Sequence, residues 1–196
     1  KEGYTHIAGC DEVGRGPPAG PLVAAAVVLD PDIEIEGLDD SKKLSDKKRQ
    51  ELAKKIREHA LHYKVVFIDN NEVDALNVYK ASQKAMTDAV LALKKVDCVL
   101  CDALPLPALN YPVESIVKGD SKSASIAAAS ILAKVERDAF MTNLAKTFPE
   151  YGFEAHKGYP TKKHLNALET FGITPHHRKT YAPVRKIIEQ QIALKI

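Results

Sequence analysis

The sequence predicts an α/β protein in which a mixed sheet is flanked by helices and followed by a helical C-terminal extension. Strand-like apolar runs alternate with amphipathic segments of helical length over residues 1–148. Glycine and proline then punctuate residues 149–196 and leave room only for short helices. We therefore expect a main domain over residues 1–148 and an extension over residues 149–196.

Composition narrows the class of protein. The chain has 196 residues, 45% hydrophobic and 28% charged, which fits one folded domain with a small appendage. Lys and Arg number 28 against 26 Asp and Glu, so the net charge of +2 does not by itself indicate a partner. The longest apolar run, 22–29, is shorter than the ~20 residues that span a bilayer, and no leader of basic and apolar residues precedes it. We expect a cytoplasmic protein that contacts no membrane.

The first third of the chain predicts two strands and a helix. Residues 4–10 and 22–29 are apolar runs, and the glycines and prolines between them favour a hairpin or a bulged turn. Ser45 then opens a helix that extends to Ala60, in which Leu52 and other apolar residues recur at helical spacing.

The middle third predicts a strand over 62–69, a long helix over 72–95 and a strand over 96–102. The last strand contains Cys98 and Cys101, which form a CxxC pattern. Strand residues three apart point to opposite faces, and no second pair of ligands has the spacing of a zinc finger. Core packing is therefore the better interpretation of both cysteines.

The last third predicts a strand over 113–117 and a helix from about Asp120 that Pro149 ends. Alanines make one face of this helix small enough for close approach to a sheet. Two short helices, over 162–171 and 184–194, complete the chain.

Carboxylates occur where strands are expected to end. Asp11 and Glu12 finish the first strand, Asp102 finishes the strand over 96–102, and Asp120 starts a helix. Ligands of α/β folds bind outside strand ends, so these acids could converge on one or two hard cations. Neighbouring strand residues face opposite sides, but at a strand end the longer Glu side chain adds reach. A helix cap remains an equal alternative for Asp120 alone.

A glycine turn, defined here as residues 14–21, follows the first two acids. Its beginning matches the GxGxxA string of dinucleotide-binding proteins, but two prolines and a second strand follow where that motif needs a helix. Glycines suit close approach of the main chain to a polar ligand, and Arg15 adds a fork of donors. A simple tight turn remains the alternative.

Five separated motifs resemble those of the ribonuclease HII family, and they follow one another in order over most of the chain. They are Asp11-Glu12-Val13-Gly14-Arg15-Gly16 with Ala19-Gly20-Pro21, Asp40-Ser41-Lys42-Lys43-Leu44, Lys118-Gly119-Asp120, the stretch 127–135, and His156-Lys157-Gly158-Tyr159. The resemblance implies a ribonuclease H-like catalytic domain over residues 1–148, with a C-terminal helical extension that contacts substrate. It also implies hydrolysis of the RNA strand of RNA/DNA hybrids, and cleavage of duplex DNA on the 5′ side of embedded ribonucleotides.

The same resemblance assigns catalytic and metal-binding roles to Asp11, Glu12, Asp102 and Asp120. Its mechanism uses two Mg²⁺ or Mn²⁺ ions about 4 Å apart, which activate a water and stabilise the leaving 3′-oxygen. The products implied are a 3′-hydroxyl and a 5′-phosphate. Carboxylates suit hard cations, so these acids fit that requirement.

Substrate contacts are implied as well. Gly14, Arg15 and Gly16 would contact the ribose and the phosphate after it, while Tyr159 would stack on the next sugar. The segment with Ser41, Lys42 and Lys43 resembles a phosphate-contacting segment, although the two lysines also fit a solvated run of charges. Weaker candidates for backbone contact are Lys118, Ser121, Lys162, Lys163, His164 and Arg178.

Two alternatives remain. A ribonuclease HIII-like hybrid nuclease should carry an extra N-terminal domain and a different glycine motif, and neither is seen in this sequence. A non-catalytic nucleic-acid-binding protein would tolerate loss of the four acids, yet all four are present. The expected partners are RNA/DNA hybrids and ribonucleotide-containing DNA duplexes, and the simplest oligomeric state is a monomer.

Overall fold

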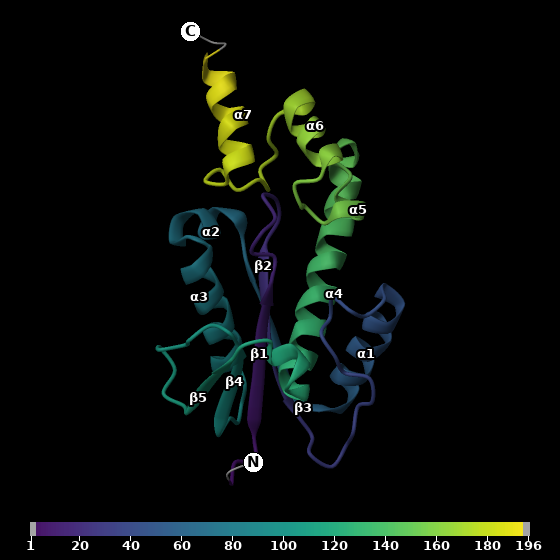
Figure 1. The fold of residues 1–196 in the computed structure, drawn as a ribbon, viewed down its shortest axis with the longest axis vertical. Helices are drawn as coiled ribbons and strands as arrows, with labels where there is room; N and C mark the ends of the chain where they lie inside the picture. Colours follow the sequence, from purple (N-terminus) through teal and green to yellow (C-terminus); the bar gives the residue numbers. More distant parts are fainter. Residues whose placement is uncertain (1–2, 194–196) are drawn as a thin grey trace. The chain divides into compact units, whose positions relative to one another are not determined.

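The computed structural model describes residues 3–193 and contains the mixed sheet that the sequence predicts. The strand order is β3-β2-β1-β4-β5, with β1 antiparallel to β2 and parallel to β4, and β4 parallel to β5 (Figure 1). The strands are β1 (Ile7–Val13), β2 (Leu22–Leu29), β3 (Ala60–Ile68), β4 (Cys98–Asp102) and β5 (Val113–Ile116).

Helices alternate with these strands and make up the C-terminal part. They are α1 (Asp46–His59), α2 (Asn70–Leu76), α3 (Val78–Leu91), η1 (Gly119–Ser121), α4 (Ala124–Thr147), η2 (Pro149–Tyr151), α5 (Phe153–His156), α6 (Lys162–Phe171) and α7 (Ala182–Ala193). The predicted end of the last helix, Leu194, lies outside the described residues. Within residues 3–193, no helix has both the length and the apolar character needed to cross a membrane.

Contacts divide the chain into two compact units. Unit 1 comprises residues 1–13, 23–67 and 82–136, and unit 2 comprises residues 14–22, 68–81 and 137–196. The glycine turn therefore belongs to unit 2, together with the C-terminal helices. The sequence-based division at residue 148 stays a prediction.

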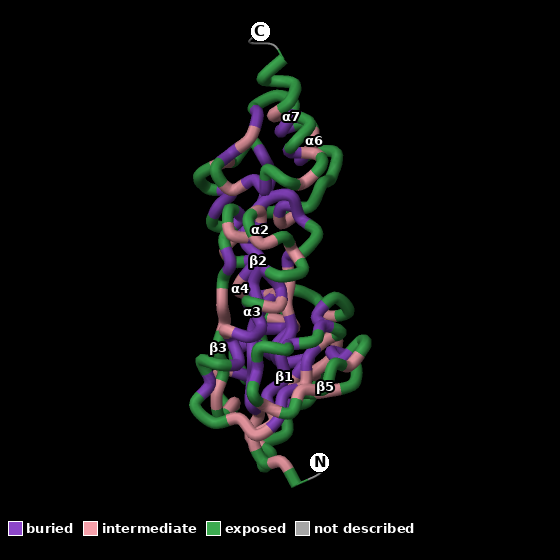
Figure 2. Tube along the Cα trace, turned by 90° about the vertical axis from the view of Figure 1, so that its left-hand side faces the viewer, coloured by how far each residue is buried: buried purple, intermediate pink, exposed green. Residues whose placement is uncertain are grey.

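The core of unit 1 fills both faces of its sheet. Val23, Ala25 and Val27 of β2 pack in one cluster with Leu52 and Ile56 of α1 and with the alanine-rich face of α4. Figure 1 shows α3 on the side of the sheet opposite α1 and α4. Because β2 is covered on both faces, it is buried along almost its whole length, which explains its unbroken apolar sequence (Figure 2).

Unit 2 has a core of its own. Met141, Tyr151, Phe153, Leu168 and Val184 are buried in one cluster that joins the end of α4 to α6 and α7. The ring of Tyr151 stacks on Phe153 at 5.4 Å between centroids, and its hydroxyl donates to the carbonyl of Gly172 at 2.7 Å. The C-terminal part is therefore well packed, although glycine and proline keep its helices short.

The structure corrects two predicted elements. The helix predicted over 72–95 is broken at Asn77, which has φ of 66° and whose side chain accepts hydrogen bonds from the amides of Tyr79 and Lys80. This positive φ, with ψ of 160°, ends α2, and the Asn77 side chain caps the following helix, so α2 and α3 are separate. The helix predicted from Asp120 begins at Ala124 instead, because residues 119–121 form a 3₁₀ turn.

The first strand is shifted by three residues from the predicted range of 4–10. It continues to Val13, so Asp11 and Glu12 lie within β1, where they pair with Ala25 and Ala24 of β2. Pairing of β1 with β4 ends earlier, at Cys10 and Cys101. Asp11 and Glu12 are therefore paired with β2 on one side of β1, but they lie beyond the last residue pair with β4 on the other side.

Gly9 of β1 lies in close contact with the main chain at the beginning of α4. A Cβ at this position would lie 2.1 Å from the main-chain carbon of Ser125. We expect Gly9→Ala to lower the free energy of unfolding by about 3 kcal/mol, since main-chain atoms of β1 or α4 must move to admit the methyl group. Gly16→Ala is the matched control, because a Cβ there has ordinary contact at 3.6 Å. Equal unfolding free energies of the two variants in urea would contradict this account.

Candidate active site

Asp11 and Asp102 follow the last residue pair of the parallel strands β1 and β4. That pair is Cys10 with Cys101, and both cysteines are buried. Parallel strands present their carboxyl ends at one edge of the sheet, so the next residue of each strand lies at that edge. The carboxylates of Asp11 and Asp102 interact electrostatically there.

The Asp11 carboxyl group is buried and its charge is unfavourable. The side chain is 7% exposed, and its Oδ1 accepts from the amide of Glu12 at 2.7 Å. Burial raises the pKa of Asp11 to about 7, a hydrogen bond from Ser130 opposes this rise, and the charges of Asp102 and Asp120 add to it. The metal-free protein therefore holds a carboxylate that any nearby cation would stabilise.

Two serines, Ser130 and Ser41, form a chain of hydrogen bonds to Asp11. Ser41 is 3% exposed, and its hydroxyl oxygen lies 2.9 Å from that of Ser130 in α4. Since Ser130 donates to the ionised Asp11 carboxylate, its own oxygen accepts from Ser41. The structure thus places Ser41 in a supporting hydrogen bond rather than on the surface. Sequence reasoning missed Ser130, whose signal is a single hydroxyl residue in a run of alanines.

Asp120 lies on the 3₁₀ turn after β5 and is 7% exposed. Burial, followed by the charges of Asp40 and Asp102, raises the pKa of its carboxyl group. The preceding amide, that of Gly119, donates to Oδ1 of Asp102 at 2.7 Å. A Cβ at Gly119 would lie 2.6 Å from Cδ1 of Ile126, so glycine allows the turn to sit against α4.

A cavity of about 530 Å³ connects these acids with basic residues. Asp40, Asp102 and Asp120 line it together with Lys42, Lys43 and Lys118. Lys43 is exposed and forms an ion pair with Asp39 at 3.0 Å, while the amide of Lys42 donates to Asp40. Two predicted phosphate-contacting lysines thus share a cavity with two predicted metal ligands.

Glu12 differs from the other three acids. Strand alternation directs its side chain to the face that Cys10 occupies, opposite to that of Asp11, although the charges of Asp11 and Glu12 both raise the pKa of the Cys10 thiol. Within residues 3–193, no three or more His, Cys, Asp or Glu side chains are arranged as a ready metal site. The grouping of buried carboxylates nevertheless has the hard oxygen donors and the unfavourable negative charge that suit a divalent cation.

The side chain of Arg178 is fully buried in unit 2 and forms hydrogen bonds to the main chain of the glycine turn. Its guanidinium donates to the carbonyl oxygens of Gly14 at 2.7 Å, Gly20 at 2.9 Å and Arg15 at 3.2 Å. The hydroxyl of Tyr181 also donates to the Arg15 carbonyl, at 2.5 Å. The conformation of the turn is therefore set by carbonyl contacts that sequence spacing does not reveal.

A second buried guanidinium, that of Arg137, joins the glycine turn to the loop before Tyr159. It donates to the carbonyls of Pro21 at 2.9 Å, Ala19 at 3.1 Å and Lys157 at 2.9 Å. Burial lowers the pKa of Arg137 to about 10. A Cβ at Gly14, where φ is 93°, would lie 2.2 Å from Nε of this arginine, so the glycine is required by packing as well as by conformation.

Tyr159 lies beside the beginning of the turn. The residue is 43% exposed, and a Cβ at Gly16 would be 3.6 Å from its Cε1. Arg15 and Gly16 are exposed. By contrast, Arg178 and His164 are 0% exposed and bond to other parts of the protein, so their interpretation as contacts to the nucleic-acid backbone is wrong.

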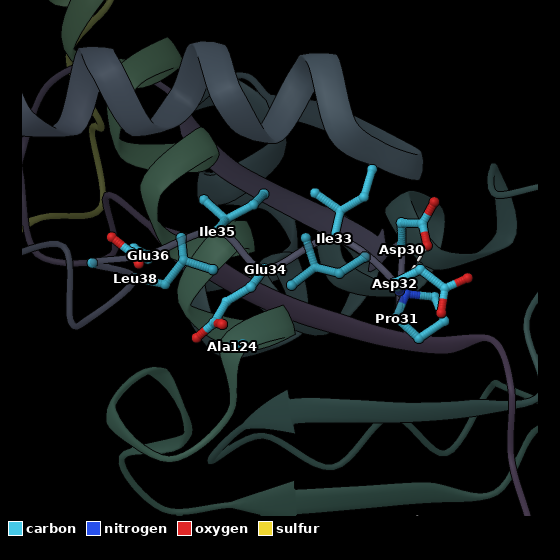
Figure 3. Close-up of a pocket in the computed structure, with 11 residues that line it drawn as sticks. Asp30, Pro31, Asp32, Ile33, Glu34, Ile35, Glu36, Leu38 and Ala124 are labelled. Atoms are coloured by element: carbon cyan, nitrogen blue, oxygen red, sulfur yellow. Dashed lines mark hydrogen bonds between the residues drawn. The ribbon is translucent and has the colours of Figure 1, made fainter.

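A larger cavity, of about 710 Å³, contains none of the predicted site residues. It is lined by Ala124 and the segment 29–38, in which Asp30, Asp32, Glu34 and Glu36 alternate with apolar residues (Figure 3). An anionic polymer would be repelled by this lining. Size alone therefore does not identify the candidate active site.

Comparison with known proteins assigns the fold and the family. A sequence profile of the family Ribonuclease HII matches residues 8–184. The chain is 51% identical over 187 residues to ribonuclease HII of Oceanobacillus iheyensis, covering 95% of this chain and 72% of that protein. It is 52% identical over 181 residues to ribonuclease HII of Clostridioides difficile, covering 92% and 71%. The crystal structure of ribonuclease H2 from Pyrococcus horikoshii superposes with a TM-score of 0.81 at 28% identity, covering 95% and 98%.

The fold and its acidic sheet edge define the class of ribonuclease H-like nucleases, as the sequence predicted. Within that class the chain belongs to the ribonuclease HII family. It is an endoribonuclease of type 2 that hydrolyses the RNA strand of RNA/DNA hybrids, and its activity depends on divalent metal ions.

The raised pKa of Asp11 predicts how stability depends on pH in metal-free buffer. Between the unfolded pKa near 3.8 and the folded pKa near 7, the folded protein keeps a proton that the unfolded chain has lost. Stability therefore falls as pH rises through this window, by up to about 1.4 kcal/mol per pH unit from this group. Asp11→Asn, which resembles the protonated form, should flatten the fall.

The free energy of unfolding in urea, measured between pH 4 and pH 8 with EDTA present, tests this effect over the window set by the shifted pKa. The native chain is compared with Asp11→Asn. Glu36→Gln is a control at an exposed acid outside the site. Identical pH profiles for Asp11→Asn and the native chain would mean that Asp11 ionises at its ordinary pKa.

Proposed function

We propose that Asp11, Glu12, Asp102 and Asp120 bind the divalent ions on which the activity of this chain depends. The charge of Asp102 raises the pKa of both Asp11 and Asp120, and the charge of Asp120 also raises that of Asp11; this carries the proposal, since it requires the three carboxylates to be close together. Glu12 adjoins Asp11 in β1 and has the longer side chain. The chemistry that two such ions supply is activation of water and stabilisation of the leaving 3′-oxygen, which gives a 3′-hydroxyl and a 5′-phosphate.

The protein's own groups tune this set of carboxylates. Ser130, supported by Ser41, stabilises the ionised form of Asp11, and the amide of Gly119 donates to a carboxylate oxygen of Asp102. Either Mg²⁺ or Mn²⁺ suits an all-oxygen donor set. Lys42 and Lys43 would contact phosphates of the substrate, because they line the cavity that holds Asp102 and Asp120.

Recognition of the ribonucleotide is proposed for the glycine turn and Tyr159. The main chain of Gly14, Arg15 and Gly16 would contact the ribose 2′-hydroxyl and the phosphate after it, so that RNA is distinguished from DNA. Tyr159 would stack on the next sugar, and its exposed ring beside Gly16 supports this role. Cleavage is then proposed on the 5′ side of a ribonucleotide, in a long hybrid or embedded in duplex DNA.

The remaining assignments follow the same proposal. Residues 1–148 would supply the catalytic domain, and residues 149–196 would form the substrate-contacting extension that carries Tyr159. We propose that the protein acts as a monomer in the cytoplasm.

Asp120→Asn tests the metal-binding role. We expect kcat on a DNA duplex with one ribonucleotide to fall by about a hundredfold or more, while duplex binding changes little, since a neutral amide weakens the metal site. Mg²⁺ should raise the thermal midpoint of the native chain, and this increase should shrink in the variant.

Asp32→Asn provides the control, because it makes the same chemical change at an exposed position. An Asp120→Asn variant that cleaves and responds to Mg²⁺ like the control would remove Asp120 from the site.

Tyr159→Ala and Tyr159→Phe test recognition of the ribonucleotide. We expect Tyr159→Ala to lower kcat/KM on a duplex with one ribonucleotide about tenfold or more, and Tyr159→Phe to have a smaller effect, because Phe keeps the stacking surface. Tyr111→Ala is a control at another partly exposed tyrosine. If Tyr159→Ala cleaves at the native rate, the ring has no part in recognition.

A further inference from the structure

Hydrogen bonds identify the protonation state of His177, which is fully buried in unit 2. Its Nδ1 lies 2.8 Å from the amide nitrogen of Thr174, which can only donate. An imidazole nitrogen accepts a hydrogen bond only when it carries no proton. The ring of His177 is therefore neutral, with its proton on Nε2.

The same reasoning extends to His164, which is also 0% exposed. Nε2 of His177 lies 3.0 Å from Nε2 of His164. Because His177 donates across this contact, Nε2 of His164 accepts, and the His164 proton must be on Nδ1. That atom lies 2.9 Å from the carbonyl oxygen of Tyr159. One directed chain of hydrogen bonds thus runs from the Thr174 amide to the Tyr159 carbonyl.

A second proton on either ring would break this chain, since it would put two N–H groups face to face. The surroundings oppose such a proton. Burial lowers the pKa of both imidazoles, and that of His177 falls to about 3. Both histidines are therefore neutral hydrogen-bonding groups at neutral pH.

The main chain around His177 is fastened to the glycine turn. His177 forms a β-bridge with Ala19, and the amide of Gly20 donates to the carbonyl of His176 at 2.9 Å. The amide of Arg178 donates to the carbonyl of Pro18 at 2.8 Å. His177 therefore contacts the turn through its main chain and His164 through its side chain, and His164 in turn donates to the Tyr159 carbonyl.

Tyr159 combines a fixed main chain with an exposed ring. Its carbonyl accepts from the Thr161 amide at 2.8 Å as well as from His164. The ring of His156 stacks on that of His164, with centroids 4.7 Å apart, and Nδ1 of His156 accepts from the amide of Gly158. These contacts hold the loop, while Tyr159 as a whole residue is 43% exposed.

We infer that His164 and His177 are positioning residues which hold Tyr159 in register with the glycine turn for recognition of a ribonucleotide. This inference rests on the proposed role of Tyr159. Neither histidine touches substrate, because both are fully buried. They act by fixing where the Tyr159 ring can lie relative to Gly16.

Two variants of His164 separate positioning from packing. In His164→Asn, the amide nitrogen can take the place of Nδ1 and still donate to the Tyr159 carbonyl, whereas His164→Leu fills the volume without a donor. On a DNA duplex with one ribonucleotide and Mg²⁺, we expect His164→Leu to lower kcat/KM about tenfold and His164→Asn to stay within about threefold of the native value. His59→Leu, at an exposed histidine, is the matched control. Thermal unfolding of each variant establishes that it is folded at the assay temperature.

The double variant His164→Leu with Tyr159→Ala tests whether the effect passes through Tyr159. If it does, His164→Leu should cost less than about twofold once the ring is absent. A full additional loss in the Tyr159→Ala background would overturn the inference. So would native-like cleavage by His164→Leu when Tyr159→Ala is impaired, although the proposed role of Tyr159 would then stand. If Tyr159→Ala itself cleaves normally, that role and the inference fall together.

A spectroscopic measurement tests the hydrogen-bond chain independently of activity. Long-range ¹H–¹⁵N correlation spectra at neutral pH should show His164 protonated on Nδ1 and His177 protonated on Nε2. The opposite tautomer or a doubly protonated ring at either position would overturn the inference, even in a protein that cleaves normally.

Discussion

Burial of like charges at the carboxyl edge of the sheet is the constraint on which the rest of unit 1 depends. Asp11 lies in β1 just past its last pair with β4, Asp102 ends β4, and Asp120 lies in the turn after β5, so strand pairing and this turn bring the three acids near one another. Their repulsion and desolvation destabilise the metal-free fold. The close contact of Gly9 with α4 and the large core between the sheet and its helices offset that cost.

Unit 2 buries positive charge instead of negative charge. Two guanidinium groups, those of Arg137 and Arg178, are fully buried, and their donors bond to main-chain carbonyls. Carbonyl dipoles stabilise each buried charge, while the positive charge remains in the interior. Such a unit attracts anions, which suits a protein whose substrate is a polyanion. The two arginines thus fix the conformation of the glycine turn and make the electrostatic potential around it more positive.

Local sequence patterns predicted most elements because their causes are local. Thr161 caps α6, and the predicted range of 162–171 is the observed one. The break between α2 and α3 at Asn77 was not predicted, because a single side chain that caps a new helix is a weak signal in the sequence. Element ends set by distant partners were missed as well, since the extension of β1 to Val13 depends on pairing with β2.

The sequence by itself determined the family, the mixed α/β class and the acids and glycines of the candidate site, because these depend on residue types at short spacings along the chain. Tertiary structure decided which polar residues face inward. Ser41, His164 and Arg178 look like surface contacts in the sequence, yet each is buried and bonded to groups about 13 to 164 residues away. Burial and long-range hydrogen bonding arise only when distant segments pack together, so no local pattern encodes them.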